Sequence, residues 1–346
     1  MPGDGTASER VPDGLYRIDA LLGGWAPDDD LSYARTLDAL TYRRAGAEGL
    51  RVPRSTDVAR RRALHDQAIT QALSEALGGR RVVAFMGGHR LGRDTPAYEV
   101  VARCARSLAA RGLLVVSGGG PGAMEAAHLG ARLAREPSGD LDDALDVLRR
   151  VAAFPEVAGE DLVRRDGTFD EGLLRALHRW QAPAFEVAAR WPEGVACETI
   201  GIPTWLYGHE PPTPLATAHA KYFDNSVRED GLLAVAKAGV VFAEGSAGTL
   251  QEVFQDAAQN HYRSVDDTRS PMVFLDVDRF WTVTRPVRPL LEGLFDDEMD
   301  AMLHFVETAE DAAAAVLGHP AAAPPLPPDP LLRPGSGATR LTPPGG

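Results

Sequence analysis

Cysteine and lysine are nearly absent from this 346-residue chain, which contains two of each. Cys104 and Cys197 are too few for a disulfide framework and lack the spacing of metal ligands, so we expect two free thiols and no metal site. Because the only lysines are Lys221 and Lys237, arginine carries nearly all of the positive charge.

The sequence also lacks long apolar runs and an excess of basic residues. No run is long enough to cross a bilayer, and residues 1–14 lack the basic and apolar segments of a signal peptide. We therefore expect a cytoplasmic protein with no membrane partner. Acidic residues outnumber basic ones by 49 to 36, a net charge of -13. Because phosphate backbones repel such a charge, nucleic acid is not an expected partner.

Composition divides the chain into a core and several additions. Residues 1–14 and 319–346 read as tails, and the second is rich in proline and glycine. Residues 15–80 are helical in pattern and form a lead-in, and residues 81–318 form the core domain. Within the core, residues 136–196 are an insertion, because an ordinary connection between two strands needs only a few residues.

Short apolar runs alternate with helical segments throughout the core. The runs have the length of buried strands, and five are predicted, at 82–86, 113–116, 199–202, 240–243 and 272–275. This alternation predicts an α/β fold, a Rossmann-like doubly wound parallel sheet with helices on both faces. The helical lead-in precedes this sheet, and the helical insertion interrupts it.

The insertion connects the end of a helix to the third predicted strand. That connection belongs at the amino ends of the strands, so we expect the insertion to lie opposite the ligand crevice. Its apolar positions, among them Leu145, Leu173 and Trp180, need a partner surface. We expect them to pack with residues 15–80 as a helical layer that does not line the pocket.

Two glycine-rich loops each follow a predicted strand and open a predicted helix. A helix N-terminus offers unpaired N–H groups to an anion, and glycine lets a phosphate approach the backbone. Both loops meet at the carboxyl edge of a parallel sheet, so we expect a phosphate-bearing ligand between them. The predicted phosphate- and nucleotide-binding residues are Gly87, Gly88, Gly118, Gly119, Gly120, Met124, Gly245, Ser246, Ala247, Gly248 and Thr249.

Two common nucleotide-binding classes are excluded by the form of these loops. The first loop partly matches the dinucleotide fingerprint G-x-G-x-x-G/A, but it follows the second strand, whereas that fingerprint follows the first. The sequence contains no G-x-x-x-x-G-K-[ST] motif. We therefore expect neither a dehydrogenase nor a P-loop NTPase, and no cofactor.

The runs SGGGPGAMEAAHLGA at 117–131 and EGSAGTLQE at 244–252 resemble the paired motifs of the LOG ("lonely guy") phosphoribohydrolases and their SLOG nucleotide-sensor relatives. The family's second motif is P-G-G-x-G-T-x-x-E, and here Glu244 replaces the proline and Ser246 the second glycine. The resemblance implies a Rossmann-like homodimer or higher homo-oligomer that binds a nucleoside 5′-monophosphate. It also implies hydrolysis of the N-glycosidic bond, which yields free base and ribose 5-phosphate.

The same resemblance implies that Glu252 and Arg228 are the catalytic pair. A carboxylate stabilises the positive charge that develops on the sugar, and an arginine can clamp the phosphate or assist the departing base. Arg90 and Lys221 are further candidates for contact with the phosphate.

Three interpretations stay open: an enzyme, a sensor that binds a nucleotide without turnover, and a Rossmann-like scaffold that has lost its site. Glu252 and Arg228 favour the enzyme. Glu244 places a carboxylate where a phosphate approaches, which favours the sensor. His209 and Glu210 follow the third strand in a loop that could close over the site.

Overall fold

The computed structural model describes residues 11–156, 162–192, 197–208, 210–262, 269–292 and 297–319. The predicted tails overlap these residues only at 11–14 and at 319. The strands of the described residues form one seven-stranded parallel sheet. They are β1 (Val82–Met86), β2 (Leu114–Ser117), β3 (Thr199–Gly201), β4 (Ala218–His219), β5 (Gly239–Phe242), β6 (Met272–Leu275) and β7 (Leu303–Val306).

The strand order is β4-β3-β2-β1-β5-β6-β7, so the chain winds outward from β1 in both directions. This reversal beside β1 is the topological switch point of a doubly wound sheet, where ligands bind beyond the carboxyl ends of the strands. The predicted α/β fold class is confirmed. Two strands were not predicted, β4 and β7, and both lie at edges of the sheet.

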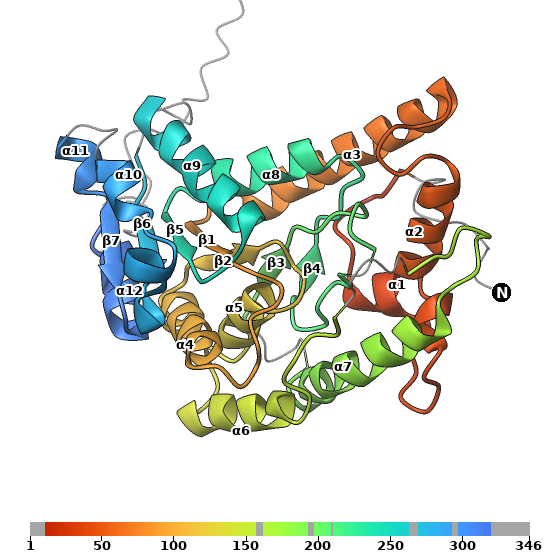
Figure 1. The fold of residues 1–346 in the computed structure, drawn as a ribbon, viewed down its shortest axis with the longest axis horizontal. Helices are drawn as coiled ribbons and strands as arrows, with labels where there is room; N and C mark the ends of the chain where they lie inside the picture. Colours follow the sequence, from red (N-terminus) through yellow and green to blue (C-terminus); the bar gives the residue numbers. More distant parts are fainter. Residues whose placement is uncertain are drawn as a thin grey trace, which may run out of the picture.

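Helices cover both faces of the sheet (Figure 1). Within β1, Val83 and Phe85 point to one hydrophobic cluster and Val82, Ala84 and Met86 to the other, as alternation along a strand requires. The first cluster is covered by α4 (Pro96–Ala110), α5 (Ala123–Arg132) and α12 (Ala309–Leu317). The second is covered by α3 (Thr56–Leu77), α8 (Asn225–Ala234) and α9 (Ala247–Tyr262).

Short helical segments complete the part of the chain between β6 and β7. The buried side chains of Trp281, Leu291 and Met299 attach this part to the second cluster. The segments are η3 (Val277–Arg279), the π-helix η4 (Phe280–Thr284), α10 (Arg288–Glu292) and α11 (Asp297–Asp300). No helix in the described ranges has both the length and the apolar character that a bilayer span requires.

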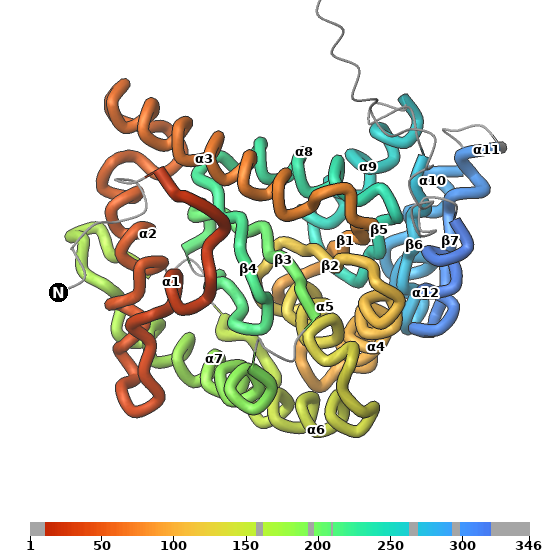
Figure 2. The backbone as a smooth tube through the Cα atoms, turned by 180° about the vertical axis from the view of Figure 1, so that it is seen from behind, coloured from red at the N-terminus to blue at the C-terminus, as the bar shows by residue number. Residues whose placement is uncertain are grey.

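The first part of the lead-in packs beside the β4 edge of the sheet, whereas its last helix, α3, covers the second hydrophobic cluster (Figure 2). It consists of α1 (Ile18–Leu22), η2 (Ser32–Arg35), α2 (Leu37–Ala47) and the long α3. A third hydrophobic cluster joins it to α7 (Glu171–Arg190), the second helix of the insertion. That cluster includes Leu21, Tyr33, Tyr42, Leu173, Leu177 and Trp180, so α7 and the lead-in form the helical layer expected from the sequence.

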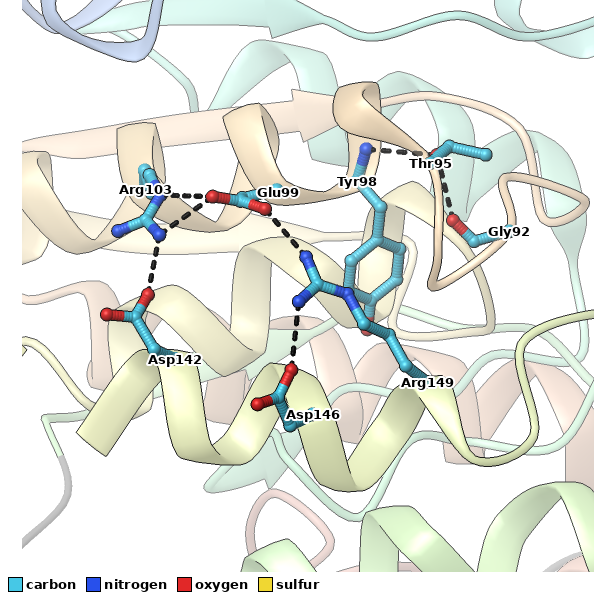
Figure 3. A network of polar contacts seen from close by, with 8 residues as sticks. All are labelled: Gly92, Thr95, Tyr98, Glu99, Arg103, Asp142, Asp146 and Arg149. Atoms are coloured by element: carbon cyan, nitrogen blue, oxygen red, sulfur yellow. Dashed lines mark hydrogen bonds and ion pairs between the residues drawn. The ribbon is translucent and has the colours of Figure 1, made fainter. Parts of the chain in front are cut away.

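The first helix of the insertion, α6 (Ser138–Arg149), packs against α7 and also lies against α4. A network of ion pairs joins α6 to α4 (Figure 3). Arg103 contacts Glu99 within α4 and Asp142 on α6, and Arg149 on α6 contacts Glu99 at 2.6 Å. Leu145 and Leu148 are buried beneath these pairs in the first hydrophobic cluster.

The insertion reaches the carboxyl edge of the sheet, and the expectation that it lies at the opposite edge was wrong. Arg93, in the loop after β1, donates hydrogen bonds to the carbonyl oxygens of Val151 (3.1 Å) and Trp180 (2.9 Å). It also pairs with Glu125 on α5 and stacks on the Trp180 ring. The 12 residues of α6 span about 18 Å, and the chain after this helix meets the loop after β1, where the Arg93 N–H donates to the Ala152 carbonyl at 3.1 Å.

Candidate functional site

Three loops meet at the switch point, beyond the carboxyl ends of β1, β2 and β5. The Gly88 N–H, after β1, donates a 2.9 Å hydrogen bond to the Glu244 carbonyl, after β5. The Gly88 carbonyl in turn accepts from the N–H of Ala123, the first residue of α5. The structure therefore brings together the loop after β1 and the two glycine loops that the sequence singled out.

Close approach of these loops explains two of the predicted glycines. A Cβ on Gly87 would lie 2.6 Å from the Cβ of Ala123, and one on Gly88 would lie 3.2 Å from the Cα of Gly245. Gly87 is therefore required for packing between loops, with or without a ligand, and Gly88 leaves little room for a side chain.

The loop after β5 leaves its helix N-terminus open. Ser246, Ala247 and Gly248 are exposed, whereas Thr249 is buried with its side chain over Gly245. A Cβ built on Gly248 meets no atom within 4 Å. The first turn of α9 thus presents backbone N–H groups to open space, as an anion site requires.

The loop after β2 is buried and held from within. Gly118, Gly119 and Gly120 are all buried, and the Gly119 N–H donates to the Ser117 hydroxyl at 3.0 Å. The same hydroxyl contacts His128 Nε2 at 2.8 Å. Burial lowers the pKa of His128 to about 3, so this imidazole is neutral and fixes the loop. Met124 covers the loop, with its sulfur 2.6 Å from where a Cβ on Gly118 would lie.

Arg228 points from α8 across the first glycine loop. Its Nε donates to the Ile202 carbonyl at 2.8 Å, and its Nη2 occupies the space beside Gly118 where a Cβ would lie. The arginine is only 9% exposed. The start of α8 is itself fixed, because the Asp224 carboxylate caps it by accepting from the N–H of Ser226 at 2.9 Å.

Glu252 is the other member of the predicted catalytic pair. It lies on α9, partly buried, and burial raises its pKa to about 7. The Arg228 charge opposes this rise, while Glu229 and Glu210 add to it. The two residues predicted as a catalytic pair are therefore close enough for the Arg228 charge to act on the pKa of Glu252. A carboxyl group that titrates near neutral pH is suited to accept a proton from water.

Glu210 lies in the loop between β3 and β4, at the carboxyl edge of the sheet. Its Oε1 lies 3.1 Å from His89 Nδ1, in the loop after β1, and its Oε2 would lie 3.8 Å from a Cβ on Gly120. Burial, and then the Arg90 charge, lower the pKa of His89. His209 lies outside the described residues.

The two predicted phosphate contacts outside the motifs lie in different surroundings. Arg90 lies in the loop after β1 and is exposed. Lys221 is 2% exposed, ion-paired with Asp38 of α2 and positioned over the Trp205 ring. Burial lowers the pKa of Lys221 and Asp38 opposes that shift. Lys221 is therefore part of the contact between the lead-in and the sheet, and it does not line the crevice.

Glu244, which replaces the proline of the family motif, is half-buried. Burial, and then the Asp278 charge, raise its pKa. Asp278 follows β6, on the side of β5 opposite β1. Within the described ranges, no group of three or more His, Cys, Asp or Glu residues could hold a metal ion.

The comparisons with known proteins add little to this geometry. No protein-family model matches the chain, and no curated protein matches it significantly. Among solved structures, the chain is similar to the molybdenum cofactor binding protein from the phototrophic bacterium Rippkaea orientalis, with a TM-score of 0.35 and 12% sequence identity. The match covers 69% of this chain and 96% of that one. A likeness at this level carries no argument about the ligand or the chemistry.

Proposed function

We propose that this protein binds a nucleoside 5′-monophosphate at the carboxyl edge of the sheet and hydrolyses its N-glycosidic bond. The products are the free base and ribose 5-phosphate. The observation that carries this proposal is that the Arg228 guanidinium lies beside the first glycine loop, while its charge acts on Glu252, on the helix that the second glycine loop opens. The resemblance of both loops to the paired LOG motifs supports it. The same resemblance supports a homodimer or higher homo-oligomer, which sedimentation velocity tests directly.

The open N-terminus of α9 is the proposed phosphate site. Ser246, Ala247 and Gly248 are exposed there, and a helix N-terminus attracts a phosphate through its N–H groups and its dipole. Glu252 lies about one turn further along the same helix, so a ribose attached to that phosphate lies beside its carboxylate.

Glu252 has two tasks in the proposed hydrolysis. Its negative charge stabilises the oxocarbenium-like sugar as the bond from C1′ to the base nitrogen breaks. It also accepts a proton from the water whose oxygen bonds to C1′, and the departing base takes up a proton in exchange. Arg228 stabilises the anionic form of Glu252 and faces the bound nucleotide from α8.

The test is Glu252→Gln, assayed for release of free base from a panel of nucleoside monophosphates and for binding by calorimetry. We expect turnover to fall by about 100-fold or more, as for loss of a general base, with the affinity nearly unchanged. Glu75→Gln, an exposed carboxylate on α3, is the matched control. Release of base by E252Q at the wild-type rate contradicts the proposal. In the wild type, kcat/KM should rise with pH through about 7, because the anionic carboxylate is the active form.

A sensor that binds without turnover is the second candidate. Glu244 and Ser246 depart from the LOG motif in the phosphate loop itself, and this departure favours a sensor over an enzyme. The same panel separates the two, since a sensor gives calorimetric binding with no release of base by the wild type.

A further inference from the structure

The Glu210 carboxylate has no task in the proposed hydrolysis, although it extends into the crevice. Its side chain is 19% exposed, and its Oε1 is 3.1 Å from His89 Nδ1. Its Oε2 lies over the first glycine loop, 3.8 Å from the position of a Cβ on Gly120. The carboxylate therefore lies between the loop after β1 and the loop after β2.

The loop that carries Glu210 is fixed on both sides of that residue. Before it, the backbone of Gly208 lies flat against the ring of Tyr42 in the lead-in, with no room for a side chain. After it, the Thr213 N–H donates a 2.9 Å hydrogen bond to the carbonyl of Gly119, within the glycine loop itself. A carboxylate held in this way is preorganised to accept hydrogen bonds from a ligand.

The position of Glu210 relative to the proposed phosphate site defines which part of a nucleotide it meets. It lies over the first glycine loop and beside the loop after β1, whereas the proposed phosphate site is the N-terminus of α9, which follows β5. Glu210 therefore faces the part of the nucleotide that extends from the phosphate across the carboxyl edge of the sheet. Hydroxyl groups are the donors that a nucleotide offers at the sugar, and an ionised carboxylate is only an acceptor. Carboxylates that bind ribose hydroxyls at this edge of Rossmann-like sheets act on the same physical basis.

We propose that Glu210 accepts hydrogen bonds from the ribose 2′- and 3′-hydroxyls, so that the site selects ribonucleotides over 2′-deoxyribonucleotides. His89 is the positioning residue, since its Nδ1 holds the carboxylate in place. This inference rests on the proposed nucleotide site. Selection follows because a deoxynucleotide leaves a partly buried acceptor without its donor, and sites built on such hydrogen bonds reject analogues that lack the hydroxyl.

The experiment compares AMP, GMP, CMP and UMP with their 2′-deoxy counterparts, by calorimetry and by release of free base. For the base that the wild type prefers, we expect the ribonucleotide to be favoured by about 10- to 100-fold, the range for one hydrogen bond to a charged group. In Glu210→Gln this preference should fall to within about threefold, through a loss confined to the ribonucleotide. Glu75→Gln is the control, and Glu210→Asp tests whether a shorter carboxylate restores part of the preference.

The outcomes separate this inference from the proposed function. If the wild type binds and hydrolyses ribo- and deoxyribonucleotides equally well, the inference is overturned but the proposed nucleotide site is not. This comparison needs no variant. Equal losses on both sugars in E210Q also overturn it, since a carboxylate that only supports the loop affects both alike. If none of the eight nucleotides binds, both proposals fall.

Discussion

The guanidinium of Arg228 occupies the space that a side chain at Gly118 would need. A Cβ on Gly118 would overlap Nη2 of Arg228 and lie 2.6 Å from the sulfur of Met124. Because Nε of the arginine is bound to the Ile202 carbonyl, the guanidinium is held between the end of β3 and the first glycine loop. The glycine at 118 is thus required by the position of an arginine on a helix more than 100 residues later in the chain.

The first prediction concerns this contact. Gly118→Ala should displace the Arg228 guanidinium and lower kcat/KM for base release by about 10-fold or more, because misplaced catalytic groups cost rate steeply. The control is Gly231→Ala, on α8 with Arg228, where a Cβ meets nothing within 4 Å. G231A should unfold at the same or a higher temperature, since alanine favours a helix over glycine. Equal activities of the two variants would show that Arg228 has no part in the reaction.

The second prediction concerns the proposed phosphate site. Gly248→Leu should abolish nucleotide binding and leave the fold intact, because the new side chain extends into open space over the N-terminus of α9. Gly139→Leu is the matched control, since Gly139 is also the second residue of a helix and its Cβ would also meet nothing within 4 Å. Calorimetry with the preferred monophosphate measures the affinity, and circular dichroism monitors the fold. An unchanged affinity in G248L places the phosphate elsewhere.

Much of this arrangement could be predicted from local sequence patterns. The strand at Met272–Leu275 was predicted with its observed bounds, because a short apolar run between turns is a local signal. The glycine loops were likewise visible, since each follows a strand and opens a helix.

What the sequence did not indicate depends on contacts between distant segments. The strand at Ala218–His219 is two residues long, too short to have a periodic pattern. The pairing of Lys221 with Asp38 joins residues 183 positions apart, and local patterns carry no signal for it. The path of the insertion was not predictable either. The hydrogen bond from Arg93 to the Trp180 carbonyl, which fixes that path, joins residues 87 positions apart.

The third prediction concerns stability and pH. Asp256, on α9, is 2% exposed, its Oδ2 has no hydrogen-bond partner among the described residues, and burial raises its pKa from 3.8 to about 8. The folded protein therefore binds a proton here that the unfolded chain releases, and the stabilising contribution is lost as pH rises from about 4 to about 8. The free energy of unfolding should fall by about 1.4 kcal/mol per pH unit in this window from this group alone.

Asp256→Asn should remove that slope, which urea unfolding at pH 5, 6, 7 and 8 measures. Burial also raises the pKa of Glu252, to about 7, so Glu252→Gln should remove a second decrease of the free energy of unfolding with pH, which ends near pH 7. Parallel pH dependences of the wild type and D256N would mean that Asp256 is ionised in the folded protein throughout this range.

The fourth prediction concerns the ion pair between the lead-in and the sheet. The Asp38 carboxylate accepts hydrogen bonds from Tyr33 (2.8 Å) and Trp205 (3.0 Å) as well as from Lys221. Lys221, in contrast, has Asp38 as its hydrogen-bonded carboxylate and lies over the face of the Trp205 ring, and the Glu210 charge acts on it more weakly. The two members of the pair are therefore not equivalent.

Removing the carboxylate should cost more than removing the ammonium. Asp38→Ala leaves Lys221 buried without its paired carboxylate, and we expect a loss of about 3–5 kcal/mol in the free energy of unfolding. Lys221→Met leaves a carboxylate that keeps two donors, so its cost should be about 1–3 kcal/mol. In the double variant the two losses should fall short of additive by at least about 1 kcal/mol, since each single variant already breaks the pair. Additive losses, or a larger cost for K221M than for D38A, would show that the pair does not join the lead-in to the sheet in this way.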